Sequence, residues 1–267
     1  NVNPVPWSGV ILDKEDIFRS SQVYDLIELN RIIYERVAAA AGARYWCCKS
    51  MANVHFADQL EAGNAGLKYI YLYRDGRDVA ASFKKAIVGE KHIYPIAKQW
   101  TEDQEACLRL SKKISADRFY ALSYEQLITK PEETIKGLCL FLDIPYVLAM
   151  LNFHTSKEAV VTAGAGAMWS NLQKPVMADN TGKFKKVFTD LDLQIFELVA
   201  GDVMRELGYP LFTNRQNAAL ISQAAIEKYL FDNEQLKKEF QKQADPNDVE
   251  KRKPQLAILN RIKQQII

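Results

Sequence analysis

The chain has few of the residues that build disulfide frameworks and metal centres. Its 267 residues include four cysteines and three histidines, with no C-x-x-C pair and no histidine cluster of the kind that binds zinc. Cys47 and Cys48 are adjacent, a spacing that rarely meets the geometry of a disulfide. We therefore expect no metal site and a reducing compartment, which favours the cytoplasm.

Long apolar runs and an excess of one charge are also missing. No segment of the sequence is long and apolar enough to suggest a membrane span, and the formal net charge is only +2. Such a balance gives no general affinity for nucleic acid, so any basic function must be local. The composition, with 48% hydrophobic and 25% charged residues, is that of a globular protein with a sizeable core.

Segments with the patterns of strands and helices alternate along residues 1–215. Apolar runs predict strands, and apolar residues at helical spacing predict helices. The expected strands are 45–48, 68–73 and 119–123, and the expected helices are 15–41, 54–63, 77–88, 92–114, 131–142 and one that Thr189 and Asp192 open and Gly208 ends. Residues 155–186 are expected to form a long loop. The alternation favours an α/β fold with a parallel sheet.

The last part of the chain has a different composition. Residues 216–267 are polar, rich in Lys and Gln and helical in pattern, with a break at 245–247. We expect two helices that form an extension of the α/β domain of residues 1–215. Each helix carries a stripe of apolar residues that must be buried somewhere, either against the domain or in a homodimer.

The most informative stretch is YLYRDGRDVAASF, at residues 71–83. An apolar run ends at Arg74, and a helical pattern begins within a few residues. Ligands of open α/β folds bind where strands end and helices begin. Two arginines beside a helix N-terminus would suit a strongly anionic ligand such as a phosphate. The alternative is that Arg74 and Arg77 form surface ion pairs with Asp75 and Asp78.

Three segments, taken in order, resemble the sulfotransferases that use 3′-phosphoadenosine-5′-phosphosulfate (PAPS). They are KYIYLYRDGRDVAASF at 68–83, FYALSYEQL at 119–127 with Pro131 and Phe141-Leu142 after it, and WSNLQKPV with TGKF at 169–184. The pattern is most similar to the group that includes bacterial and tyrosylprotein sulfotransferases, and it covers roughly residues 45–210. The resemblance implies a P-loop-like three-layer core with a parallel sheet.

The resemblance also implies roles for individual residues. Arg74 and Ser82 would hold the 3′-phosphate, Tyr124 would contact the adenosine side, and Lys183 would reach a phosphate. The backbone of 170–176 would cover the adenine and ribose. The implied cofactor-binding residues are therefore Arg74, Ser82, Tyr124, Ser170, Lys174 and Lys183.

The resemblance places the chemistry at Lys49, which follows the expected strand 45–48. A fixed cation there would stabilise the charge that develops on the leaving phosphate. An acceptor hydroxyl must also lose its proton, and cytosolic members use a histidine where this chain has Met51. His55 lies one helical turn further on and is the candidate base, while Asp13 and Glu15 are weaker candidates.

One part of the family's pattern is missing. The loop that cradles the 5′-phosphosulfate, typically Pro-Arg-Ser-Gly-Thr-Thr-like, has no counterpart, because residues 6–10 lack a basic residue, a preceding strand and a following helix. Since the first residue is Asn1 and not Met, we expect the loop to lie upstream. An upstream membrane anchor would place the protein in the Golgi lumen instead of the cytoplasm.

Two other functions compete with a sulfotransferase that modifies a hydroxyl or an amine. A nucleotide-kinase-like phosphotransferase would need a Gly-x-x-x-x-Gly-Lys-Ser/Thr loop and magnesium ligands, and neither is visible. The non-catalytic alternative is an inactive sulfotransferase fold with residues 216–267 as the partner surface. The acceptor, a small molecule or a peptide, depends on loops 1–14, 84–95 and 155–180, whose composition fits both.

Overall fold

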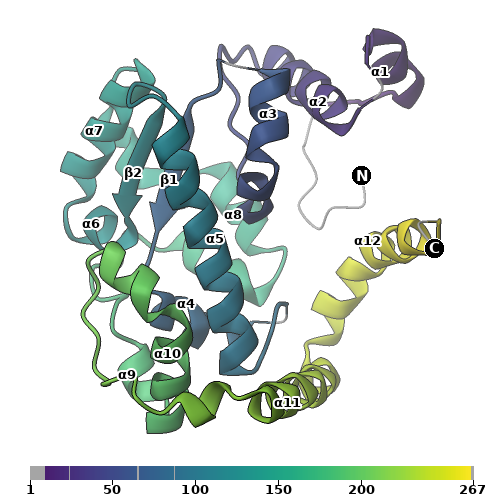
Figure 1. Ribbon diagram of the computed structural model, residues 1–267. Helices are drawn as coiled ribbons and strands as arrows, with labels where there is room; N and C mark the ends of the chain where they lie inside the picture. Colours follow the sequence, from purple (N-terminus) through teal and green to yellow (C-terminus); the bar gives the residue numbers. More distant parts are fainter. Residues whose placement is uncertain (1–9, 24, 65, 87, 266–267) are drawn as a thin grey trace.

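The computed structural model describes residues 10–23, 25–64, 66–86 and 88–265 (Figure 1). Residues 6–9 of the rejected loop segment therefore lie outside the described part. The protein is mostly helical, with a small parallel sheet near its centre. The long helix α5 (Ile93–Lys113) lies along this sheet and contacts helices from several parts of the chain.

The sheet consists of β1 (Tyr69–Tyr73) and β2 (Phe119–Ser123), which pair in parallel with Tyr71 opposite Ala121. Both strands and their parallel pairing confirm the sequence prediction. The strand expected at 45–48 is wrong: this segment is irregular, and Tyr45 is 53% exposed. A strand needs a partner for its backbone groups, and among the described residues only β1 and β2 pair.

The two faces of β1 differ in burial. Tyr71 is buried, and its hydroxyl donates to Gln104 Oε1 on α5. Ile70 and Leu72 alternate with it along the strand and stay 39% and 51% exposed. Parallel sheets are usually covered on both faces. The described residues cover this part of β1 on the α5 side, so the three-layer core stays a prediction.

The hydrophobic core lies between α5, α4 (Gly76–Phe83) and α10 (Asp190–Glu206). Ala97, Phe196 and Met204 have no exposed surface there. Helix α10 opens with the predicted capping box, in which Thr189 Oγ1 and Asp192 Oδ2 each accept the other residue's backbone N–H. Gly208, at a φ of +83°, follows its end as expected.

The N-terminal helical segment differs from the prediction of one helix over 15–41. It forms α1 (Lys14–Ser20) and α2 (Leu26–Ala40). Ser21 is extended, and the side chain of Asp25 caps α2 by accepting from Glu28 N at 2.7 Å. Apolar periodicity continues through this break, which is why the sequence pattern did not show it.

Helix boundaries near the site also differ from the sequence prediction. Helix α4 begins at Gly76, because the Asp75 side chain caps it by accepting from Arg77 N, and ends at Phe83 instead of residue 88. The expected 54–63 helix is the 3₁₀ helix η1 (Met51–Phe56) followed by α3 (Ala57–Gly63). After β2 come α6 (Tyr124–Thr129), the predicted α7 (Pro131–Leu142) and η2 (Leu148–Thr155).

The expected loop over 155–186 is partly helical. It contains α8 (Lys157–Ala163) and the 3₁₀ helix η3 (Ala167–Gln173), and α9 (Phe184–Val187) begins within it. The Ser156 side chain caps α8 by accepting from Ala159 N. The segment that remains irregular before α9 contacts Arg74, the residue that follows β1.

The C-terminal residues form η4 (Ala218–Ile221) and the two expected helices, α11 (Gln223–Gln243) and α12 (Pro246–Gln265). Helix α11 packs on α5 and buries Tyr229 and Asn233. Helix α12 projects beyond α11 (Figure 1). Its Lys251 Nζ nevertheless donates to Gly164 O, just after α8.

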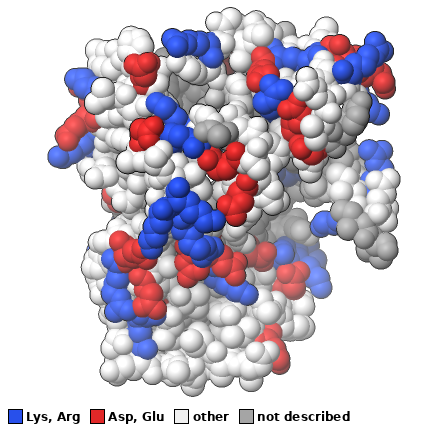
Figure 2. All heavy atoms as spheres, turned by 45° about the horizontal axis from the view of Figure 1, so that its top comes forward, with Lys and Arg blue, Asp and Glu red and all other residues white. Residues whose placement is uncertain are grey.

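Charges of both signs are interspersed over the face shown in Figure 2, with one larger basic group near its middle. No helix among the described residues has the length and apolar character needed to cross a membrane. Within the same residues, no three His, Cys, Asp or Glu side chains are grouped as metal ligands.

Candidate functional site

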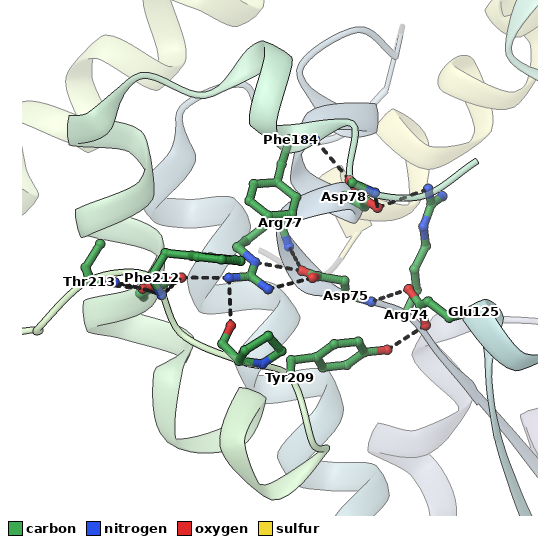
Figure 3. A network of polar contacts seen from close by, with 12 residues as sticks. Arg74, Asp75, Arg77, Asp78, Glu125, Phe184, Tyr209, Phe212 and Thr213 are labelled. Carbon is green, nitrogen blue, oxygen red and sulfur yellow. Dashed lines mark hydrogen bonds and ion pairs between the residues drawn. The ribbon is translucent and has the colours of Figure 1, made fainter. Parts of the chain in front are cut away.

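The candidate site is the junction between β1 and α4, at residues 74–78 (Figure 3). The strand ends at Tyr73, and α4 begins three residues later, at Gly76. Gly76 is required here because a Cβ atom at this position would lie 2.7 Å from the rings of Trp100 and Phe196. The start of α4 is therefore held close to the core, and the junction side chains around it have fixed surroundings.

Arg77 is a structural residue of this junction. Its guanidinium donates to Asp75 Oδ2 and Glu197 Oε1, both at 2.7 Å, and to Pro210 O at 2.9 Å. It lies over the rings of Phe184 and Phe212, 4.4 and 4.8 Å from their centroids. The Arg77 side chain is only 1% exposed. It is thus committed to the interior and unavailable to a ligand.

Glu197 compensates this buried charge and is itself fully satisfied. Besides Arg77, its carboxylate accepts from Phe212 N and from both Thr213 N and Thr213 Oγ1. These donors compensate the cost of burying the carboxylate. The pair ties α4 and α10 to the segment that follows α10 (Figure 3).

Arg74 is the arginine that remains at the surface of the junction. Its guanidinium carbon lies 4.3 Å from the ring centroid of Tyr124, and its Nη2 donates to Asn180 O at 2.7 Å. The side chain is 18% exposed. Among the described residues, its Nε is buried and has no hydrogen-bond partner. Arg74 is therefore oriented on two sides and retains donor capacity.

The turn at 180–184 lies beside Arg74, and its backbone is hydrogen-bonded to the carboxylate of Asp78. Gly182 N donates to Asp78 Oδ2 at 2.7 Å, and Phe184 N donates to Asp78 Oδ1 at 3.0 Å. At the start of the turn, Asn180 Nδ2 donates to the hydroxyl of Tyr124. The junction, β2's end and this turn consequently form one network.

Glu125, on α6, binds the backbone of the junction just after β1. Its Oε1 accepts from Asp75 N at 3.1 Å, and its Oε2 accepts from the hydroxyl of Tyr209 at 2.8 Å. Burial, followed by the Glu125 carboxylate, raises the pKa of Tyr209. Tyr209 therefore stays a protonated donor throughout the neutral range and holds Glu125 in place.

Two other predicted cofactor residues lie next to this network. The hydroxyl of Ser82 donates to Asp78 O at 3.0 Å, one turn before it in α4, and Ser82 is exposed. Lys183 is exposed and stands between the two residues that donate to Asp78. The structure thus brings Arg74, Ser82, Tyr124 and Lys183 into one part of the molecule.

Ser170 lies in the middle of η3 and Lys174 directly follows that helix, and both are exposed. Their neighbour Trp169 contacts α12, where the guanidinium carbon of Arg252 lies 5.5 Å from the centroid of its indole ring. Among the described residues, no hydrogen bond or ion pair joins them to Arg74.

Lys49 and His55 precede β1 in the chain. Lys49 is exposed on the irregular segment before η1, so the strand-end argument for its position is wrong, while its chemical role stays a prediction. His55 Nε2 lies 2.7 Å from Asp103 Oδ1 on α5, and its side chain is 40% exposed. A carboxylate partner of this kind orients an imidazole ring.

Sequence reasoning named Asp78 only as a surface ion-pair partner, and it gave no role to Asn180 or Glu125. Only Asp78 had a local signal, because it follows Arg74 by four residues and helical geometry brings such pairs together. Their nitrogen and oxygen atoms lie 3.8 Å apart. Glu125 and Asn180 contact the junction although they are separated from it by 50 or more positions in the sequence. No sequence pattern indicates contacts between such distant positions.

Comparison with known proteins connects this geometry to a family. The sequence model described as "Sulfotransferase family" matches residues 10–147, just over half of the chain. An uncharacterized protein of Aquifex aeolicus (strain VF5) is 29% identical over 103 residues, or 36% of this chain. The match spans only 14% of that protein's length.

Two solved structures share the fold. The sulfotransferase domain from the curacin biosynthetic pathway has a TM-score of 0.57 at 21% identity, and the match covers 69% of each chain. The sulfotransferase domain from the Synechococcus PCC 7002 olefin synthase has a TM-score of 0.54 at 22% identity, covering 74% of each chain. At these identities the likeness concerns the fold alone.

Proposed function

The chain belongs to the sulfotransferase family, and from this premise we propose that it transfers a sulfuryl group from PAPS to a hydroxyl, or alternatively an amine, of an acceptor. When bound, PAPS supplies the sulfuryl group and leaves as 3′,5′-diphosphoadenosine. The acceptor is a small molecule or a peptide.

The observation that carries the proposal is the state of Arg74. Its Nε is buried without a hydrogen-bond partner in the described part of the chain, which is costly unless a ligand completes the bond. Its stacking on Tyr124 and its bond to Asn180 O fix the plane of the guanidinium. A fixed, incompletely bonded arginine at a helix N-terminus suits a phosphate group, so the residues present fit the 3′-phosphate.

The neighbouring residues supply the rest of the nucleotide contacts in this proposal. Ser82 adds a hydroxyl and Lys183 a positive charge, both beside Asp78. The Tyr124 ring would contact the adenosine side. Ser170 and Lys174 would cover the adenine and ribose, which requires the η3 segment to approach the junction.

Lys49 and His55 carry the chemical step in this proposal. Lys49 stabilises the negative charge that develops on the leaving phosphate oxygen, and a charge held in place by the protein does this better than solvent. His55 removes the proton of the acceptor hydroxyl, with Asp103 orienting its ring at 2.7 Å.

Nucleotide binding tests the proposal directly. Isothermal titration of 3′,5′-diphosphoadenosine and of 5′-AMP should show a strong preference for the first. Arg74→Ala should remove most of that preference, on the order of 1.5–3 kcal/mol for a charge-assisted bond. Equal affinity of the parent protein for the two nucleotides would refute the assignment of the 3′-phosphate.

Arg215→Ala is the matched control. Arg215 is 19% exposed, close to the 18% of Arg74, and its Nε is also buried without a partner among the described residues. It pairs with Asp202 at the far end of α10. This variant should lose stability and keep the preference for the 3′-phosphate.

A further inference from the structure

We infer that Asp78 is a positioning residue for the nucleotide site, which fixes Arg74 and the Lys183 turn relative to each other. The inference rests on the proposed function, because it assigns phosphate contacts to those two cations. Asp78 itself would touch no substrate. Its role is to set the distance between two positive groups that come from distant parts of the chain.

The Asp78 side chain has the burial and bonding expected of a fixed support. It is 1% exposed. Each of its carboxylate oxygens accepts from a backbone N–H of the turn, Oδ2 from Gly182 at 2.7 Å and Oδ1 from Phe184 at 3.0 Å. Lys183 is the residue between these two donors. The carboxylate therefore determines where the backbone of Lys183 lies.

Arg74 is placed by the same two elements. Its Nη2 lies 3.8 Å from Asp78 Oδ2 and donates to Asn180 O, at the start of the turn. The Asp78–Gly182 bond joins residues 104 positions apart in the sequence. If that bond is lost, the turn loses its attachment to α4, and Arg74 loses the fixed position of its acceptor.

The negative charge of Asp78 makes the inference testable, because a charge effect and a positioning effect change phosphate affinity in opposite directions. A carboxylate 3.8 Å from Arg74 opposes the binding of an anion there. If Asp78 acted only through its charge, Asp78→Asn would therefore tighten phosphate binding. If it acts by positioning, the same substitution weakens binding, because an amide offers one acceptor in place of two and turns a donor toward an N–H.

The experiment measures the ratio of the affinities for 3′,5′-diphosphoadenosine and 5′-AMP in the parent protein and in Asp78→Asn. We expect the ratio to fall about tenfold, the effect of losing one good hydrogen bond to the nucleotide. Hydrogen exchange at the amides of Gly182 and Phe184 should accelerate in the same variant. An unchanged or increased ratio in the folded variant would overturn the positioning role.

Two further variants separate positioning from general stability. Asp192→Asn alters another carboxylate, at the start of α10, which accepts hydrogen bonds from a backbone N–H and from a lysine side chain. This variant should leave the affinity ratio unchanged. Gly182→Ala leaves Asp78 intact but strains the turn, because Gly182 has a φ of +67°, which side chains disfavour. The added Cβ would meet no atom beyond the neighbouring residues within 4 Å, so the strain comes from the backbone alone. Gly182→Ala should lower the affinity ratio, and it tests the positioning role even if Asp78→Asn fails to fold. An unchanged ratio in Gly182→Ala would count against that role.

The outcomes also separate this inference from the proposed function. A parent protein that binds both nucleotides equally refutes the 3′-phosphate assignment, and the positioning role with it. A parent protein that prefers 3′,5′-diphosphoadenosine, with an Asp78→Asn variant that keeps the full preference, refutes the positioning role alone.

Discussion

Arg77 and Glu197 form an ion pair of 2.7 Å in which the two side chains are 1% and 0% exposed. The pair explains the presence of one of the two arginines at the end of β1. Arg77 and Arg74 are separated by two residues, yet one is enclosed by carboxylates and aromatic rings and the other stacks on Tyr124 at the surface. The junction thus commits Arg77 to the interior and leaves Arg74 with unused donor capacity.

Breaking this buried pair should strongly destabilise the protein. In Arg77→Met the Glu197 carboxylate would remain buried without its partner, which costs about 3–5 kcal/mol. Urea denaturation followed by circular dichroism would measure the loss. Arg205→Ala is the control, because the Arg205–Asp202 pair is 60% and 76% exposed and should contribute less than about 1 kcal/mol. A similar small effect of both substitutions would contradict the structural role of Arg77.

Lys49→Ala should lower turnover far more than it lowers nucleotide affinity. The lysine is needed when charge moves onto the leaving group, so kcat should fall on the order of 10²–10³-fold, while binding of 3′,5′-diphosphoadenosine stays within a few fold. Lys112→Ala, at a lysine that is 72% exposed on α5, provides the control. Unchanged turnover in Lys49→Ala would remove it from the chemistry.

Asn233 joins the C-terminal helix α11 to the rest of the protein. Its Oδ1 accepts from Lys91 N at 2.8 Å and from His92 N at 2.9 Å, and the residue is 3% exposed. Asn233→Ala would leave two backbone donors without their acceptor, at a cost of about 2–4 kcal/mol. Thermal unfolding would detect it, and Asn260→Ala on exposed α12 should have little effect. Equal stabilities would show that α11 is not fastened there.

Stability should depend on the protonation of His92. Burial is the main cause that lowers its pKa, with Lys84 adding to it and Asp232 and Asp192 opposing it. Its Nδ1 also accepts from Tyr94 N at 3.2 Å, which a protonated ring cannot do. Because the unfolded chain binds this proton more readily, the contribution is complete above the unfolded pKa of about 6.5 and declines as pH falls below it.

The measurement for His92 is the free energy of unfolding from pH 8 down to pH 5. His92→Gln keeps an acceptor for Tyr94 N and cannot titrate in this range, so its profile should be flatter than that of the parent protein. Parallel profiles would show that other groups cause the pH dependence.

Local signals in the sequence predicted the elements that they control. The apolar runs at β1 and β2, Pro131 at the start of α7 and the Thr189–Asp192 capping box all act within a few residues, and each formed as expected. The run at 45–48 has the same apolar character as β1, but the part of the chain that the structure describes offers it no neighbouring strand. Its composition could not show this, because pairing depends on chain segments far away.

The site was predictable only in part for the same reason. The motif at 74–78 and the family resemblance pointed to Arg74, Ser82, Tyr124 and Lys183, which lie around one network. Which of the two arginines would be buried depends on Glu197, 120 residues later in the chain. A pattern read over a short window cannot contain that partner.

The separation of Arg77 from its partners has a consequence for biosynthesis. The arginine precedes Glu197 by 120 residues and Pro210 by 133. At about 5–20 residues per second, a ribosome needs roughly 6 to 24 seconds to synthesise the first of these stretches. Of the two carboxylates that pair with Arg77, only Asp75 has been synthesised during that interval, so the junction cannot adopt its final arrangement. The arrangement of the junction is therefore complete only after Pro210 has been synthesised.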